Sequence, residues 1–238
     1  ANEREARLVD GVCVCGLKSL GEIFRQLLQG ETIGCIKKTD TLFEREVVAG
    51  QGDFADISGQ SGMKRAAEIA VAGRHNLLMV GPPGSGKSMI AKRIPTIFPA
   101  LTREERLRIT KVYSVAGMIK SEQPLVMERP FREVNQTVTK AALLGGGAWP
   151  KPGELTLASG GVLFLDELAE FKRSVLEVLR QPLEEREVRI VRNHGVIIYP
   201  ADVMLVAAMN PCPCGYFSDL NKCTCTISQI RQYQGKIS

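Results

Sequence analysis

Residues 81–88 have the types and the spacing of a phosphate-binding loop. They read Gly-Pro-Pro-Gly-Ser-Gly-Lys-Ser, which matches the pattern G-x-x-x-x-G-K-[ST]. Glycines let backbone N–H groups turn toward phosphate oxygens, Lys87 can reach the β- and γ-phosphates, and the Ser88 hydroxyl can hold Mg²⁺. The apolar run 77–80 before the loop and the helical run 89–94 after it disfavour a chance glycine-rich turn. We therefore expect ATP to be bound by Gly81, Pro82, Pro83, Gly84, Ser85, Gly86, Lys87, Ser88 and Met89, together with Asp166.

Two carboxylates follow a second apolar run, in a position that suits the same chemistry. Residues 162–165 are Val-Leu-Phe-Leu, and Asp166 and Glu167 come directly after them. In open parallel sheets, ligands lie at the carboxyl ends of the strands. Asp166 is therefore expected to hold Mg²⁺ through water, and Glu167 to orient and polarise the attacking water. On its own, an apolar run that ends in Asp-Glu often marks no more than the end of a strand.

A third apolar run, residues 203–208, is followed by Met209 and Asn210. A polar side chain that ends a strand beside the phosphate-binding loop can sense the γ-phosphate or hold the lytic water. Asn210 fits this role. The catalytic residues that we expect from the sequence are Lys87, Glu167 and Asn210.

Four of the seven cysteines lie close together near the C-terminal end of the sequence. They form two C-x-C pairs, Cys212 with Cys214 and Cys223 with Cys225. Four thiolates at this spacing suit a closed tetrahedral site for structural Zn²⁺. The spacing is tighter than that of the usual C-x-x-C site, so four reduced cysteines in a polar loop stay open as the alternative. This clustering, within an odd total of seven, favours a metal site in a reducing compartment over a disulfide framework.

Residues 187–198 alternate between apolar and polar side chains and turn at residues 193–195, which read Asn-His-Gly. This pattern is typical of a β-hairpin. Arg189, Arg192 and His194 make the hairpin basic and are the candidate contacts to DNA phosphates. A solvated hairpin face accounts for the same residues equally well.

The elements that must position these side chains are also visible in the sequence. Helical spacing of apolar residues marks 61–72, 102–112 and 171–183, and the apolar runs described above predict buried parallel strands. Thr102 and Glu105 form a capping box at the start of the second helix. Together these elements predict an α/β fold with a parallel sheet between helices.

Less regular stretches indicate how the chain is divided. Residues 1–30, with a predicted short strand at 12–15, are too few to bury a core and read as the tail of another domain. Residues 31–52 have the composition of a linker, and residues 53–238 form the main domain. Within it, residues 113–158 lack sustained periodicity and read as a long, irregular, functional loop.

The composition is that of a soluble globular protein. The 238 residues are 44% hydrophobic and 24% charged, and no apolar run approaches the length of a membrane span. The net charge of +5 permits an acidic partner such as nucleic acid without requiring one. A cytoplasmic location without a membrane partner is expected. Because the sequence begins at Ala1 and not at Met, we read it as a fragment or a processed chain.

These stretches, taken together, resemble the Mg-chelatase-like AAA+ ATPases of the ComM/YifB type. The resemblance covers residues 53–238 densely, and residues 1–30 are similar to the end of the family's N-terminal domain, which has a fold like Lon protease or ribosomal S5. The matching stretches lie at residues 54–60, 75–88, 113–117, 129–132, 145–147, 152–154, 161–168, 180–184, 207–216 and 236–238.

The resemblance implies an AAA+ P-loop core with a helix-2 insert within residues 113–158 and a pre-sensor hairpin at 186–200. It further implies a homohexameric ring that hydrolyses ATP and, in members that act in natural transformation, a helicase that drives branch migration of DNA. The sequence departs from the family after Arg132, where Glu-Val-Asn-Gln-Thr replaces Ser-Pro-His-His-Thr. It also ends at Ser238, before the family's arginine finger and helical lid, so we expect this piece to bind nucleotide and hydrolyse it poorly.

Two other functions stay open. One is a chelatase-type motor that works on a protein or metal-porphyrin partner, and the other is a nucleotide-dependent adaptor that does not hydrolyse ATP. The chelatase relatives lack the four-cysteine segment, which favours the ComM side. The intact Lys87, Asp166, Glu167 and Asn210 disfavour the adaptor. ATP turnover of the full-length protein with and without branched DNA separates the three.

Overall fold

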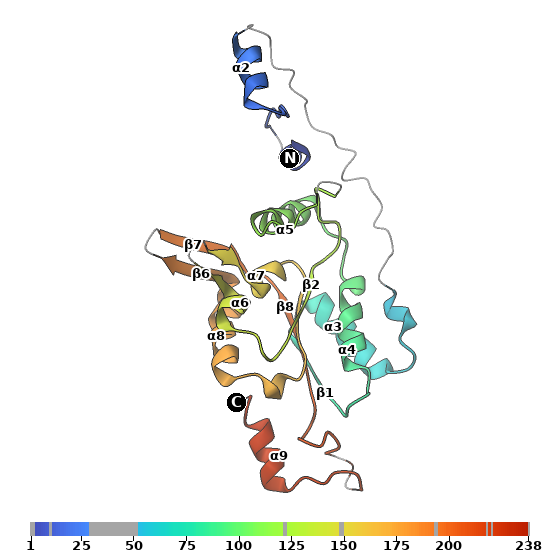
Figure 1. Cartoon of the computed structure of the whole chain (residues 1–238). Coiled ribbons are helices and arrows are strands. Elements are labelled where there is room, and N and C mark those ends of the chain that lie inside the picture. The colour runs from blue at the N-terminus through green and yellow to red at the C-terminus, as the bar shows by residue number, and fades with distance from the viewer. Residues whose placement is uncertain are drawn as a thin grey trace. The chain divides into compact units, whose positions relative to one another are not determined.

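The computed structural model describes residues 3–9, 11–28, 52–120, 123–147, 150–192, 195–217, 219 and 221–237 (Figure 1). The chain divides into two compact units, Ala1–Val48 with Leu101–Met127, and Ala49–Ala100 with Glu128–Ser238. Residues 31–51 of the predicted linker lie outside the described residues, and the predicted domain boundaries stay a prediction. None of the helices in the described ranges is long and apolar enough to span a membrane.

The first unit contains three described helices, α1 (Glu3–Ala6), α2 (Leu20–Leu28) and α5 (Arg103–Val115). The capping box predicted for α5 is confirmed, since Thr102 and Glu105 bond each other's backbone N–H groups. The short strand predicted at residues 12–15 is wrong. These residues form no strand, and only Val14 makes an isolated β-bridge. Cys13 is disulfide-bonded.

The second unit is built on a four-stranded parallel sheet. Its strands are β1 (Leu77–Val80), β2 (Phe131–Val134), β5 (Val162–Leu165) and β8 (Met204–Met209), in the order β1-β8-β5-β2. The apolar runs that predicted β1, β5 and β8 are confirmed as strands of one sheet. The burial predicted for β1 is wrong, because β1 is an outer strand of the sheet and its Leu78 and Val80 are exposed. Because these strands are parallel, their carboxyl ends lie on the same side of the sheet. The loop after β1, the carboxylates after β5 and the asparagine after β8 therefore all follow from that side.

Two hydrophobic cores cover the two faces of this sheet. Alternate residues of β5 point to opposite faces, so Phe164 packs in one core while Leu163 and Leu165 pack in the other. Figure 1 shows α3 (Ser61–Gly73) and α4 (Lys87–Arg93) on one side and α6 (Lys140–Leu144) and α8 (Arg173–Glu185) on the other. The complete burial of β5 explains its uniformly apolar sequence.

The prediction of an irregular stretch at residues 113–158 is wrong for much of its second half. It contains β2, which pairs with β5 at the edge of the sheet. The hydrophobic pattern did not indicate this strand, because the charged residues Arg132 and Glu133 occupy two of its four positions. In the structure, Arg132 forms an ion pair with Glu154, and Glu133 forms one with Lys92. The stretch also holds α6, the two-stranded ribbon of β3 (Gly145–Gly146) and β4 (Lys151–Pro152), and α7 (Glu154–Leu157).

The remaining described elements flank the sheet. Strands β6 (Glu187–Arg192) and β7 (Gly195–Pro200) form the predicted antiparallel hairpin. Helix α9 (Ile227–Gln234) comes after the four cysteines and begins with a capping box at Thr226. Short 3₁₀ helices are present at Phe54–Asp56, Ile94–Ile97 and Leu168–Glu170.

Candidate nucleotide site and cysteine cluster

The loop between β1 and α4 has a path that needs glycine. Gly84 and Gly86 have φ angles of 76° and 83°, in the left-handed region that costs about 1–2 kcal/mol per residue when a side chain is present. A Cβ atom on Gly81 would lie 3.1 Å from the hydroxyl oxygen of Ser85. The loop is therefore a cradle of backbone in which side chains at these three positions would be strained or crowded, as a phosphate site requires.

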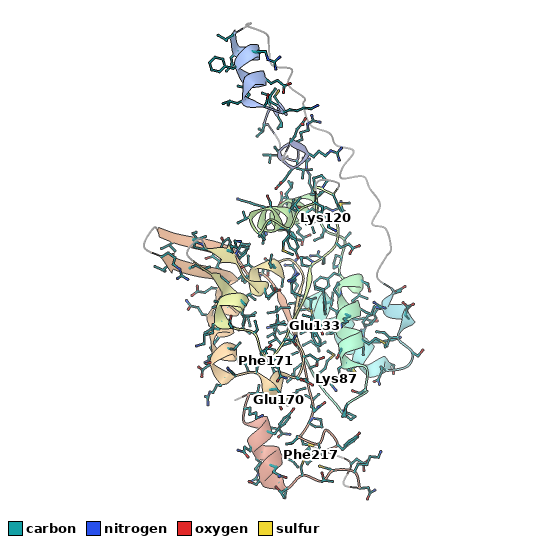
Figure 2. All side chains as sticks on the ribbon, in the orientation of Figure 1. Lys87, Lys120, Glu133, Glu170, Phe171 and Phe217 are labelled. Carbon is teal, nitrogen blue, oxygen red and sulfur yellow. The ribbon has the colours of Figure 1, made fainter. Side chains whose placement is uncertain are left out.

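Lys87, labelled in Figure 2, begins α4 directly after the loop and is buried. Its ammonium group donates hydrogen bonds to the carbonyl oxygens of Gly81 (2.8 Å) and Pro82 (2.9 Å). It also contacts the side-chain oxygen of Asn210 at 3.5 Å. Burial lowers the pKa of Lys87, and the carboxylate of Asp166 acts in the opposite direction. A polyanion in the loop would restore a full partner to this partly desolvated cation.

Ser88 and Asp166 are brought together as predicted. The Ser88 hydroxyl donates to Oδ2 of Asp166 at 2.7 Å, and the backbone N–H of Glu167 donates to Oδ1 of the same carboxylate at 2.9 Å. Hydroxyl and carboxylate oxygens are ligands that Mg²⁺ accepts in nucleotide sites. The donor set at the mouth of the loop therefore fits Mg²⁺, and the glycine cradle with Lys87 fits the phosphates of a nucleotide.

Glu167 stands in an unusual backbone conformation next to this pair. Its φ is 53°, one of four non-glycine residues with positive φ in the described chain. The side-chain amide of Gln136 lies 3.5 Å from Oε2 of Glu167. Gln136 was not singled out in the sequence, although it lies in the stretch after Arg132 that departs from the family pattern. It follows β2 and reaches the carboxylate because β2 pairs with β5.

Asn210 lies where the sequence predicts, at the end of the strand beside β1. Met209 pairs with Val80, and its carbonyl accepts a hydrogen bond from the backbone N–H of Gly81 at 3.3 Å. This bond joins the start of the phosphate-binding loop to the residue before Asn210. The contact of the Asn210 side chain with Lys87 then connects the two loops a second time.

The four C-terminal cysteines form one cluster, which we call the cysteine cluster: Cys212, Cys214, Cys223 and Cys225. Their sulfur atoms all lie within 4.8 Å of one another, and all four thiols are free. Cys212 Sγ lies 3.3 Å from Cys214 Sγ and 3.9 Å from Cys223 Sγ, and the latter two are 3.6 Å apart. A tetrahedral Zn²⁺ site with bonds of about 2.3 Å places its sulfurs about 3.8 Å apart. The spacing predicted from the sequence thus becomes a compact four-sulfur group.

Backbone N–H groups point at these sulfurs. The N–H of Phe217 donates to Cys212 Sγ at 3.2 Å, and the N–H of Cys214 donates to Cys225 Sγ at 3.4 Å. A backbone bond from Tyr216 is the main cause that lowers the pKa of the Cys214 thiol to about 6. For Cys225 the backbone N–H of Cys214 lowers the pKa, but burial and the neighbouring thiols outweigh it and raise the pKa to about 11. Such donors stabilise thiolates, which are the form that binds metal.

The two candidate arginines of the hairpin are exposed residues of β6. Arg189 forms ion pairs with Glu185 at 3.8 Å and Glu187 at 3.5 Å, and Arg192 donates to the carbonyl of Gly147 at 3.3 Å. The two arginines are three positions apart in β6 and so lie on opposite faces of the strand. Residues 193–194, and with them the candidate His194, lie outside the described residues.

Comparison with known proteins gives a consistent result. The family model described as magnesium chelatase, subunit ChlI, matches residues 53–238. The chain is 44% identical over 240 residues to the uncharacterized protein Rv2897c of Mycobacterium tuberculosis, covering 100% of this chain and 46% of that protein. It is 46% identical over 188 residues to the competence protein ComM of Haemophilus influenzae, covering 78% of this chain and 36% of that protein. The chain thus spans about half or less of the length of these relatives.

A solved structure shows the same fold at low sequence identity. The magnesium chelatase complex of subunits BchI and BchD aligns with a TM-score of 0.54 and 21% identity, over 71% of this chain and 58% of that chain. The resemblance to ComM/YifB proteins is confirmed by the ComM and YifB matches, and the predicted AAA+ α/β fold by the parallel sheet. The chain belongs to the magnesium chelatase subunit ChlI family, in its Mg-chelatase-like ComM/YifB branch of AAA+ proteins.

Proposed function

We propose that the chain is the catalytic core of an ATP-hydrolysing motor subunit. The observation that supports this most directly is the convergence of Lys87, the Ser88–Asp166 pair and Asn210 at the carboxyl ends of the parallel strands. Bound ATP with Mg²⁺ supplies the phosphoryl group that is transferred to water. The chain contributes positioning and charge, which dominate catalysis of phosphoryl transfer.

Each residue of the site has a defined part in this proposal. Lys87 neutralises charge on the β- and γ-phosphates, and the oxygens of Ser88 and Asp166 hold Mg²⁺. Glu167 orients the attacking water and polarises it as a general base. The side-chain amide of Gln136 holds the Glu167 carboxylate in position. Asn210 contacts Lys87 and faces the same loop, so it reads whether the γ-phosphate is present.

We further propose that six copies form a ring that remodels branched DNA. The match to a competence protein supports a DNA substrate, and the BchI–BchD complex shows that a protein of this fold assembles with another subunit. The exposed Arg189 and Arg192 of the hairpin are the proposed contacts to phosphates, together with His194. Contacts of this kind carry little sequence information and weaken as salt increases.

The family description favours a second function, a chelatase-type motor that acts on a protein or metal-porphyrin partner. A non-hydrolysing adaptor is disfavoured because Lys87, Asp166, Glu167 and Asn210 are all in place. ATP turnover of the full-length protein, measured without DNA, with linear duplex and with a four-way junction, separates these functions. Stimulation by the junction supports the DNA motor. Turnover that DNA does not change favours the chelatase-type motor, and no turnover in any condition contradicts both.

We also propose that the cysteine cluster binds one structural Zn²⁺ and that the protein works in the cytoplasm. The four sulfurs have the separation of a ZnS₄ site, and four protein ligands leave no open position for catalysis. Elemental analysis of the purified full-length protein should give one zinc per chain. Absence of zinc together with four thiols that react freely with a thiol reagent would refute this assignment.

A further inference from the structure

The cysteine cluster lies against the phosphate-binding loop. Gly215, which follows the first C-x-C pair, has a φ of 86°. A Cβ atom placed on it would lie 2.6 Å from Cδ and 3.2 Å from Cγ of Pro83, and 3.9 Å from Cγ of Asn210. The backbone of Gly215 therefore packs against the loop at Pro83 so closely that a side chain would collide with it, and it lies beside the side chain of Asn210.

The turn that carries Gly215 is held by the cluster itself. The N–H of Gly215 donates to the carbonyl of Cys212 at 3.0 Å, and Cys212 is fully buried. Cys214 lies within the same turn and donates its N–H to the sulfur of Cys225. Two of the four proposed ligands are thus in the four-residue turn 212–215. Cys223 is joined to the turn through contacts of its sulfur with those of Cys212 and Cys214, and Cys225 through the N–H of Cys214.

We propose that the metal-bound turn 212–215 is one wall of the nucleotide site, so that metal binding at the cysteine cluster sets the affinity for nucleotide. This inference rests on the Zn²⁺ binding proposed above and extends it from a structural role to control of the ATP site. A bound ion fixes the positions of Cys212 and Cys214, and these fix the Gly215 backbone against Pro83 and Asn210. Without the ion the turn can move away, and the loop loses its contact at Pro83.

The first test removes the metal without changing the amino-acid sequence of the turn. Full-length protein is compared as zinc-loaded, chelator-stripped and zinc-restored samples, each after removal of chelator and at equal Mg²⁺, with ADP affinity measured by calorimetry. Because loss of positioning at a ligand site is costly, we expect stripping to weaken ADP binding about tenfold and zinc to restore it. Cys223→Ser with Cys225→Ser should mimic stripping, and Cys15→Ser, which changes a free exposed thiol, should not.

The second test changes the contact and keeps the metal. Gly215→Ala should weaken ADP binding about tenfold while the zinc content stays at one per chain, because the new methyl group collides with Pro83. Gly117→Ala is the matched control: its φ is 72°, but no described atom lies within 4 Å of the added Cβ. A double-mutant cycle of Gly215→Ala with Pro83→Ala should show non-additive effects on ADP affinity, because the two groups touch.

The outcomes separate this inference from the proposals beneath it. If ADP affinity is unchanged in both the stripped protein and Gly215→Ala, and zinc is present in the untreated sample, the turn 212–215 is not a wall of the nucleotide site. The proposal of a structural zinc site is then unaffected. Absence of zinc from the untreated protein overturns the zinc proposal and this inference together. ADP binding requires neither hydrolysis nor DNA, so failure of the motor proposal has no effect on either test. Circular dichroism of each sample checks that the fold is retained.

Discussion

The nucleotide site and the hairpin present their charged residues in opposite ways. Lys87 is 8% exposed and is held by carbonyl groups of its own loop, whereas the Arg189 side chain is 58% exposed and pairs with glutamates of its own and the preceding element. The first arrangement is fixed before any ligand arrives. The second depends on surface ion pairs that contribute little to stability and can be exchanged for a partner. The difference accords with the proposed catalytic role of the first region and the proposed DNA contact of the second.

The supporting strands explain this difference. Strand β5 is buried at all four positions, so the residues that follow it start from a fixed point. Strand β7 has Val196 and Ile198 exposed, and its partner β6 exposes Val191. The hairpin therefore packs through one face only, with Val188 and Ile190 in the core. Substitutions should have large, local effects in the first region and smaller, partner-dependent effects in the second.

The largest effect is expected from Glu167→Gln, which should break the chemistry and leave binding intact. Because the amide cannot draw a proton from water, ATP turnover of the full-length protein should fall about 1000-fold. ATP affinity, measured by calorimetry, should stay within a factor of two of wild type. Glu170→Gln, a nearby exposed change, is the control and should turn over normally. Equal loss of affinity and turnover would show that Glu167 is structural.

Lys87→Ala should break binding itself. The variant loses the ammonium group that the loop directs at the phosphates, and we expect about 100-fold weaker ATP binding, since two charge-assisted bonds contribute about 3 kcal/mol. Lys92→Ala lies in the same helix, with a half-exposed side chain paired to Glu133, and serves as the matched control. Wild-type affinity in Lys87→Ala would remove the phosphate-binding role of the loop.

The hairpin should respond only when DNA is present. Arg189→Ala with Arg192→Ala should lower the affinity of the assembled full-length protein for DNA about tenfold and reduce the salt slope of binding by about 1.8, from two lost phosphate contacts. Basal ATP turnover should not change. Arg173→Ala with Arg180→Ala removes the same charge from exposed, ion-paired positions of α8 and should leave the slope unchanged. Equal slopes for the two double variants would place the DNA contact elsewhere.

The smallest effect is expected from Gln136→Ala. Loss of one amide–carboxylate contact at 3.5 Å frees the Glu167 side chain. ATP turnover should therefore fall about threefold, with no change in ATP affinity. Gln181→Ala removes a comparable contact with Glu185 on the surface of α8 and should have no effect on turnover. If the two variants behave alike, Gln136 does not position the catalytic carboxylate.

The sequence predicts the apolar strands of the sheet better than the charged one. Strands β5 and β8 are apolar because they are buried, and β1 could be recognised because it is apolar throughout and precedes the phosphate-binding loop. The phosphate-binding loop and α5 carry their own local signals. Strand β2 could not be recognised, because Arg132 and Glu133 look like loop residues until their partners Glu154 and Lys92 are brought near. A strand with charged residues at its centre is recognised only from its pairing with a distant strand, which periodicity in a short window does not record.

The site shows the same division. Lys87, Ser88 and Asp166 lie within recognisable motifs, and the structure brings them together as predicted. The contact of Gln136 with Glu167 depends on β2 lying beside β5, and the contact of Gly215 with Pro83 joins residues more than a hundred positions apart. Neither contact has a spacing signature. The candidate catalytic and binding residues could thus be named from the sequence, whereas the residues that contact and position them could not.

The left-handed backbone of Glu167 sets stability against function at one position. A residue with a side chain is disfavoured in this region by about 1–2 kcal/mol, whereas glycine is not. A Glu167→Gly variant should therefore relieve this local strain even as it removes the catalytic carboxylate. Selection for thermal stability alone would discard this glutamate, so retaining it in a laboratory evolution experiment requires a simultaneous demand for ATP turnover.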